Sequence, residues 1–251
     1  MRKYTCLFFL LLLIFASHQT YAQFPLGKQK AKLSGIRIAI GGAEDLYSNL
    51  SSEGLFSMLK PNQQVDFDLD NYEEMGGYRT LMTGGTLGVD LIFNPRKVNG
   101  TTRNNREIRV GANIGIEREV MIDVVAKNPL GDPYDNIGLC VIENSFNLEV
   151  AYLFKASPIK VLQFYAGPGA NLGGTFGNRF LFVGDPSDIG DKKAKNSNYL
   201  RAYAVAGATF GVSKIFFQLE GKLGVGTQIV HDGKASSLTS YGLQIGLGYR
   251  W

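Results

Sequence analysis

The sequence predicts an all-β fold, an eight-stranded antiparallel up-and-down transmembrane β-barrel preceded by a cleaved signal peptide. Three observations favour this fold. Segments of about ten residues carry apolar side chains at every second position, as in strands with two unlike faces. The later connections between these segments alternate between long and short, as outer loops and periplasmic turns do. The first residues have the layout of an export signal.

The export signal has three parts. Arg2 and Lys3 precede the uncharged run Cys6–Ala16, and a polar stretch then ends in the small residue Ala22. The run is too short to span a bilayer, which takes about 20 apolar residues, so a retained anchor is the less favoured alternative. We therefore expect a signal peptide at residues 1–22, a periplasmic segment at 23–32 and the barrel domain at 33–251.

The charge balance and the cysteine count argue against nucleic-acid binding and against an intrachain disulfide. Loss of Arg2 and Lys3 leaves 24 of the 26 Lys and Arg residues against 22 Asp and Glu, so the net charge falls from +4 to +2. A nearly balanced charge gives no electrostatic basis for binding nucleic acid. Only Cys140 remains of the two cysteines, and a single thiol cannot close an intrachain disulfide.

The alternating segments predict eight strands with one apolar face each. The last is the clearest, because its apolar residues Tyr241, Leu243, Ile245, Leu247, Tyr249 and Trp251 are separated by Gly, Gln or Arg. The others lie near 36–41, 86–93, 107–117, 145–154, 162–172, 200–210 and 215–225. The second face is rich in Gly, Ala, Asn and Tyr rather than Lys and Ser, which favours a narrow closed interior over a water-exposed sheet. Closure also removes the unpaired edges that lipid could not satisfy.

The inward positions carry five acidic and five basic side chains. They are Asp90, Glu107, Glu117, Glu149, Glu220, Arg37, Arg109, Arg201, Lys222 and Arg250. A buried ion without a partner costs several kcal/mol, so we expect mutual pairing in a plug of salt bridges. A proton or ion path opened by rearrangement is the alternative.

No motif predicts a catalytic, cofactor-binding or metal-binding site. The acidic run Asp66–Glu74 fails as an EF-hand, since Asn71 stands where Gly is needed and Gly77 where a bidentate Glu is needed. We interpret it as a solvated outer loop, with a looser divalent site as the alternative. His231-Asp232 is the only His–acid pair of the mature chain, and nothing in the sequence orients a nucleophile beside it. Residues 46–59 are expected to form a short helix over the barrel mouth.

Two segments resemble a known group of proteins. The end of the chain, YGLQIGLGYRW, resembles the C-terminal assembly signal of outer-membrane barrels, and Phe164–Gly174 is similar to glycine-rich strands of Bacteroidetes PorT-like barrels. The resemblance is to the small outer-membrane β-barrel superfamily, which includes barrels of the OmpA and OmpX type.

That resemblance implies a location in the bacterial outer membrane and a non-enzymatic structural, adhesive or accessory role. It implies as partners the outer-membrane lipid, lipopolysaccharide, the barrel-assembly machinery and a possible periplasmic or secretion component. A narrow channel or apolar-ligand transporter is one alternative function, and a subunit of a secretion or motility machine is another. Basic residues expected at the periplasmic rim, among them Lys28, Lys32 and Arg103, suit anionic headgroups or such a component.

Overall fold

The computed structural model describes residues 25–26, 29–48, 50–62, 67–76, 80–83, 85–95, 105–127, 136–184, 191–211, 214–230 and 235–251. The expected signal peptide lies outside these residues. No helix among them has the length and apolar character needed to cross a bilayer.

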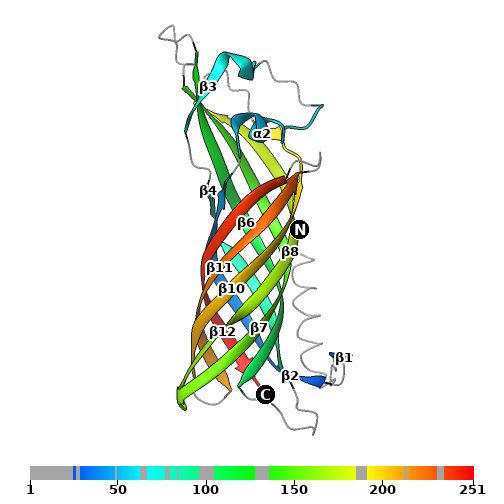
Figure 1. The fold of residues 1–251 in the computed structure, drawn as a ribbon, viewed down its shortest axis with the longest axis vertical. Coiled ribbons are helices and arrows are strands. Elements are labelled where there is room, and N and C mark those ends of the chain that lie inside the picture. The colour runs from blue at the N-terminus through cyan, green and yellow to red at the C-terminus, as the bar shows by residue number, and fades with distance from the viewer. Residues whose placement is uncertain are drawn as a thin grey trace.

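Eight long strands close into a barrel, as predicted (Figure 1). They are β2 (Gln29–Tyr47), β5 (Thr86–Pro95), β6 (Arg106–Ala126), β7 (Asn136–Ile159), β8 (Leu162–Val183), β10 (Ser197–Phe210), β11 (Ile215–Val230) and β12 (Ala235–Arg250). Each pairs antiparallel with the next, and β12 pairs with β2 to close the ring. Closure leaves no sheet edge among these strands to face lipid.

Short elements extend the barrel at its two ends. Strands β3 (Tyr72–Gly76) and β4 (Thr80–Thr83) pair with β6, and β9 (Lys192–Lys193) pairs with β8. The helix α2 (Ser52–Phe56) and the 3-10 helix η1 (Leu69–Asn71) lie at the same end as β3, opposite the C-terminus (Figure 1). Strand β1 (Pro25–Leu26) pairs with β2 at the other end.

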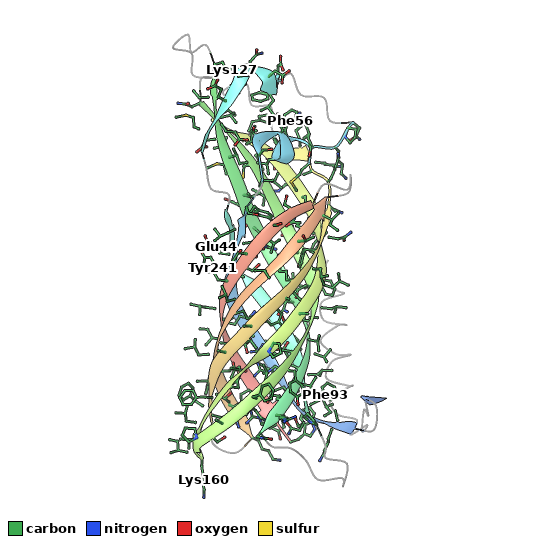
Figure 2. The ribbon with its side chains drawn as sticks, in the orientation of Figure 1. Glu44, Phe56, Phe93, Lys127, Lys160 and Tyr241 are labelled. Atoms are coloured by element: carbon green, nitrogen blue, oxygen red, sulfur yellow. The ribbon has the colours of Figure 1, made fainter. Side chains whose placement is uncertain are left out.

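The outer surface is apolar along the barrel. Leu243 and Ile245 of β12 are 68% and 60% exposed, and comparable side chains project from the other strands (Figure 2). Exposed aromatic residues gather near the periplasmic end: Phe154, Phe164, Phe210, Phe217, Tyr249 and Trp251. From the alternation of its strand, Phe93 is expected to join this belt at the end of β5, but it is buried. A closed barrel with this outer surface is built to sit in hydrocarbon.

Strands β6, β7 and β8 extend beyond the membrane belt (Figure 1). The connection between β6 and β7 lies within two residues of the expected range 125–138, whereas β8 continues to Val183, into the loop expected at 176–198. The short connection expected at 155–158 also moves, because β7 continues to Ile159 and the turn lies at 160–161. Leu139, Val141 and Ile122 on these extensions are fully buried. They belong to a hydrophobic core outside the barrel, which we call the extracellular core.

The predicted helix over the barrel mouth is present as α2 and closes the extracellular core. Ser51 is its N-cap, and the Ser51 hydroxyl accepts a hydrogen bond from the Gly54 N–H at 3.1 Å. Leu55 and Met58 are buried against residues of β6, β7 and β8. Around them lie Tyr47, Leu50, Val120, Val124, Ile137, Phe180, Ala194 and Leu238.

Candidate functional site: the charged lumen

Nine of the ten charged residues expected inside the barrel point into it, and one does not. Glu117 is exposed and has a φ of 51°, because the β6–β7 register shifts between Gly115 and Arg118. A β-bulge of this kind adds a residue to one strand and exchanges the two faces beyond it. Arg118 therefore occupies the inward position that was assigned to Glu117.

Glu220 is the centre of the lower group of charges, on the periplasmic side of the lumen. Its Oε2 lies 3.2 Å from Arg37 Nη1 and accepts a charge-assisted hydrogen bond from Arg109. Lys222 Nζ is 3.7 Å from the second carboxylate oxygen, and the Tyr165 hydroxyl donates to Glu220 at 2.9 Å. One buried carboxylate thus stabilises three cations.

The remaining charges of the lower group form pairs around this centre. Asp90 accepts from Arg37 Nε at 2.5 Å, and Glu149 accepts from Lys222 Nζ at 2.8 Å.

Glu107 lies at the periplasmic end of the lumen and contacts three cations. It accepts from Arg109 Nε at 2.6 Å and from Lys155 Nζ at 3.3 Å, and Arg250 Nη2 lies 3.8 Å away. Arg250 is the most exposed of these ions, with a third of its side chain open to solvent.

A separate upper group lies where the barrel meets the extracellular core. Asp45 accepts from Arg201 at 2.6 Å and from Arg118 and the Ser240 hydroxyl at shorter distances. Glu143 lies 3.8 Å from Arg118. Asp45, Arg118 and Glu143 were not predicted, because they stand outside the segments in which alternation is visible in the sequence.

Aromatic rings and glycines complete the filling of the lumen. The Arg109 guanidinium lies 4.5 Å from the Tyr165 ring centre, a cation–π contact. The Tyr203 ring reaches Gly169 so closely that a Cβ there would come within 2.4 Å of the ring. Glycine is therefore required opposite this tyrosine.

The two groups of charges leave a small polar cavity between them. It has a volume of about 70 Å³, and Asn113, Asn147, Tyr203, Arg201 and Lys222 are among the residues that line it. A cavity of this size has room for a few water molecules. Paired ions of the lower and upper groups lie on either side of it.

The described residues of the acidic run take part in capping and helix contacts. Asp68 accepts from the Asp70 N–H at 3.2 Å and caps η1, while Glu74 accepts from the Ser52 N–H beside α2. His231, Asp66 and Gly77 lie outside the described residues. Among the residues described, no three His, Cys, Asp or Glu side chains are grouped so that they could hold a metal ion.

The C-terminal segment is strand β12, which pairs with β2 where the barrel closes. Its six alternating apolar side chains, Tyr241 to Trp251, are between 40% and 68% exposed. The Trp251 N–H donates to the Ser34 carbonyl at 3.2 Å, so the end of the chain is tied to β2.

No family model and no curated protein matches this sequence. Solved structures of similar outline include Neisserial surface protein A (9% identity, 88% of this chain, 99% of that chain, TM-score 0.48). They also include OprG, an outer membrane protein of Pseudomonas aeruginosa (11%, 87%, 96%, 0.41), and Ail, the attachment invasion locus protein of Yersinia pestis (12%, 87%, 99%, 0.36). At these identities and scores the likeness carries no information about function.

Proposed function

We propose that this chain is a non-enzymatic integral protein of the bacterial outer membrane, in which a blocked barrel anchors a folded extracellular part. The observation that supports this most is the division of the molecule. The lumen is filled by paired ions, whereas β6, β7 and β8 continue outward around a separate hydrophobic core. An anchor needs a rigid closed wall, and a structural or adhesive surface needs an ordered body beyond the lipid.

The periplasmic end supports a stable position in lipid. Lys214 Nζ lies 6.0 Å from the Tyr249 ring centre, and the Arg106 guanidinium lies 5.5 Å from that of Phe154. Cations beside interfacial aromatic rings suit the level of anionic headgroups. Lys28 and Arg103 of the expected rim lie outside the described residues.

The extracellular part supports a role in surface contact. Phe67 stacks on Tyr72 with ring centres 4.6 Å apart, and Phe182 and Phe56 lie 5.1 and 6.0 Å from Phe67. All four rings are partly buried, so the cluster both stabilises this part and leaves aromatic edges at its surface. Such clusters occur at protein contact surfaces. Lipopolysaccharide, which surrounds this level of a barrel, is a further proposed partner.

The proposal has three further parts. The chain is a member of the PorT-like group, the barrel-assembly machinery recognises it, and it acts as a subunit of a secretion machine. Their support is the resemblance of the terminal and glycine-rich strands described above. Recovery of a stable complex by affinity purification from intact envelopes would favour the secretion role. Recovery of the chain alone would favour the structural role.

Single-channel recording tests the blocked lumen. The purified barrel in a planar bilayer is expected to be electrically silent. A triple variant Arg37→Ser, Arg109→Ser, Glu220→Ser removes the centre of the lower group, so the folded variant should give measurable current. Electrophoresis with and without heating shows whether the variant has folded. Steady conductance of the unaltered barrel would overturn the anchor proposal in favour of a narrow channel.

A further inference from the structure

The extracellular continuation of β6, β7 and β8 is apolar on both of its faces. One face packs against α2 and forms the extracellular core. The other face carries Met121, Cys140, Ile142, Leu181 and Val183, which we call the outer patch. Met121 pairs with Cys140, and Cys140 pairs with Leu181, so these three side chains share a face. None of the five residues belongs to the extracellular core.

The outer patch faces away from the rest of the described chain. Val183 is 48% exposed, and Met121, Ile142 and Leu181 are half-buried. Cys140, the smallest of the five, is buried between its larger neighbours. A contiguous apolar surface outside lipid marks an interaction site.

The height of the outer patch places it beyond the hydrocarbon. A strand that rises about 3.3 Å per residue and tilts by about 40° gains about 2.5 Å of height per residue. On β7, Ile142 therefore lies about 30 Å and Cys140 about 35 Å above the periplasmic aromatic belt at Phe154. The apolar band of a membrane barrel is only about 25 Å tall.

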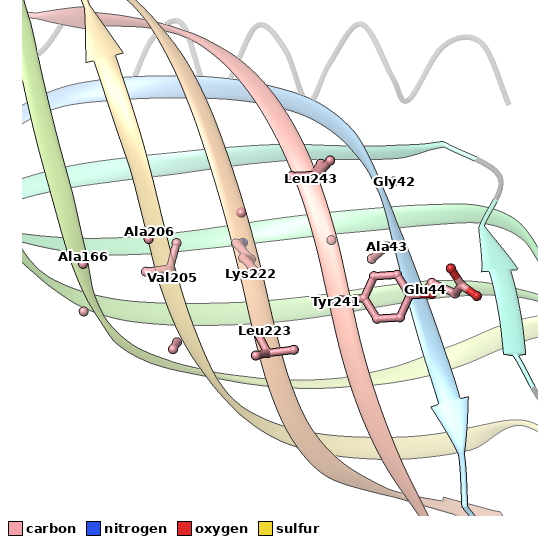
Figure 3. A pocket seen from close by; sticks show the side chains of 14 residues that line it. Gly42, Ala43, Glu44, Ala166, Val205, Ala206, Lys222, Leu223, Tyr241 and Leu243 are labelled. Atoms are coloured by element: carbon pink, nitrogen blue, oxygen red, sulfur yellow. The ribbon is translucent and has the colours of Figure 1, made fainter.

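Apolar side chains within that band need no protein partner, because lipid chains cover them. The hollow between β8 and β2 is an example, and Ala166, Ala206 and Leu243 are among the residues that line it (Figure 3). Above the band, lipopolysaccharide presents sugars and phosphates, which offer hydroxyl groups and charges instead of apolar surface. Removal of the outer patch from water therefore calls for a protein partner.

Opposite charges flank the outer patch. Glu119 on β6 pairs with Ile142, and Ile142 pairs in turn with Arg179 on β8. Burial raises the pKa of the Cys140 thiol most; Glu119 also raises it and Arg179 lowers it, so both charges lie near the centre of the patch. Arg179 is 2.9 Å from Asp191, but both side chains are nearly half exposed, and such a surface pair contributes little. The patch thus has an acidic edge on β6 and a basic edge on β8.

We propose that the outer patch binds the same patch of a second copy of this chain, across a two-fold axis parallel to the membrane normal. Two copies in one membrane hold this surface at the same height and facing sideways. A half-turn about the axis brings the acidic edge of each copy onto the basic edge of the other, so Glu119 faces Arg179 of the partner subunit. Ile142 and Cys140 lie near the axis. The inference rests on the anchor proposal, in which this end of the barrel lies outside the cell, and adds a partner to it.

Disulfide cross-linking of the full chain in intact outer membranes tests the position of the axis. Cys140→Ala removes the buried thiol, and Ile142→Cys in that background places one thiol beside the axis. Leu243→Cys in the same background is the matched control, because Leu243 is 68% exposed on β12, across the ring from β7. Oxidation with copper phenanthroline should cross-link Ile142→Cys into a dimer about tenfold more than Leu243→Cys, since pairing raises the effective concentration of the thiols.

Charge reversal tests the two edges. Glu119→Lys and Arg179→Glu, each in the Ile142→Cys background, place like charges across the axis, so each variant alone should cross-link severalfold less. When the two variants are produced together with different affinity tags, opposite charges meet at both contacts, and a mixed dimer should form again. Glu53→Lys reverses an exposed charge on α2, away from the patch, and should leave cross-linking unchanged.

Equal cross-linking of Ile142→Cys and Leu243→Cys would overturn the proposal, as would charge reversals without effect or a cross-linked product that contains another protein. If Arg179→Glu released bound lipopolysaccharide and left cross-linking unchanged, the basic edge would belong to lipopolysaccharide and the dimer would be refuted. Heat-dependent electrophoretic migration shows that each variant has folded. A folded and electrically silent monomer refutes only the dimer and leaves the anchor proposal intact.

Discussion

Removal of the charge at Glu220 should destabilise the barrel more than any surface substitution. Glu220 is 1% exposed and faces Arg37, Arg109 and Lys222, so Glu220→Gln keeps the shape and leaves three buried cations with less compensation. Each ion pair near 4 Å is worth about 4 kcal/mol at an effective dielectric constant of about 20. Desolvation offsets much of this, and loss of one partner from a buried pair typically costs about 3–5 kcal/mol.

The free energy of unfolding can be measured by urea titration of the barrel refolded into lipid vesicles, with Trp251 fluorescence as the signal. With a slope of about 2 kcal/mol per molar urea, the midpoint should fall by roughly 2 M. Glu119→Gln, at an exposed acid on β6, is the control and should change stability by less than about 0.5 kcal/mol.

A second substitution makes the argument specific to charge. Arg109→Met in the Glu220→Gln background removes a cation that has lost one of its two carboxylate partners, and the other partner, Glu107, keeps Lys155 and Arg250. The double variant should therefore be more stable than Glu220→Gln alone, with a coupling of about 1–3 kcal/mol. If Glu220→Gln unfolds at the same urea concentration as Glu119→Gln, the lumen ions contribute nothing to stability and the reasoning fails.

Three further predictions concern other parts of the chain. Leu55→Ala should loosen the extracellular core by about 2–5 kcal/mol, so that limited proteolysis cuts outside the barrel while heat-dependent migration is unchanged. Burial raises the pKa of the Cys140 thiol, in the extracellular continuation of β7, to about 11. Roughly one such thiol in a thousand is ionised at pH 8, so a maleimide should react slowly until urea unfolds the protein, and faster as pH rises toward the pKa. Deletion of Trp251 should slow insertion by purified assembly machinery, measured as the folded fraction over time, and insertion at the normal rate would contradict the assigned assembly signal.

The membrane part of the fold could be predicted because its two faces meet opposite environments. Where lipid lies on one side and the lumen on the other, alternation is imposed on every strand, as in β12. The alternation alone therefore predicted that the side chains of residues such as Arg37 and Glu220 point into the lumen. Their partners could not be predicted, because pairing across the lumen depends on how the barrel closes.

The extracellular continuation was missed for a physical reason. The run Ile137–Ile142 is apolar at nearly every position, and five consecutive residues from Ile137 are buried. A strand covered on both faces loses its period of two. On β6, Val120, Ile122 and Val124 are buried and alternate with partly buried residues, so this stretch keeps a period of two, but Asp123 interrupts its apolar pattern. Neither stretch was included in a predicted strand. The bulge at Glu117 was hidden as well, since a single added residue leaves no mark on composition.

The upper group of charges links the two parts into one structure. Tyr47 packs in the extracellular core, while its hydroxyl donates to Gln228 inside the barrel, and Gln228 Nε2 donates to Glu143 at 3.3 Å. Asp45, two residues before Tyr47, is held by Arg118 and Arg201 from β6 and β10. Because the same short stretch of β2 serves both the polar group and the apolar core, displacement of one must disturb the other. The arrangement therefore ties the orientation of the extracellular core to that of the barrel.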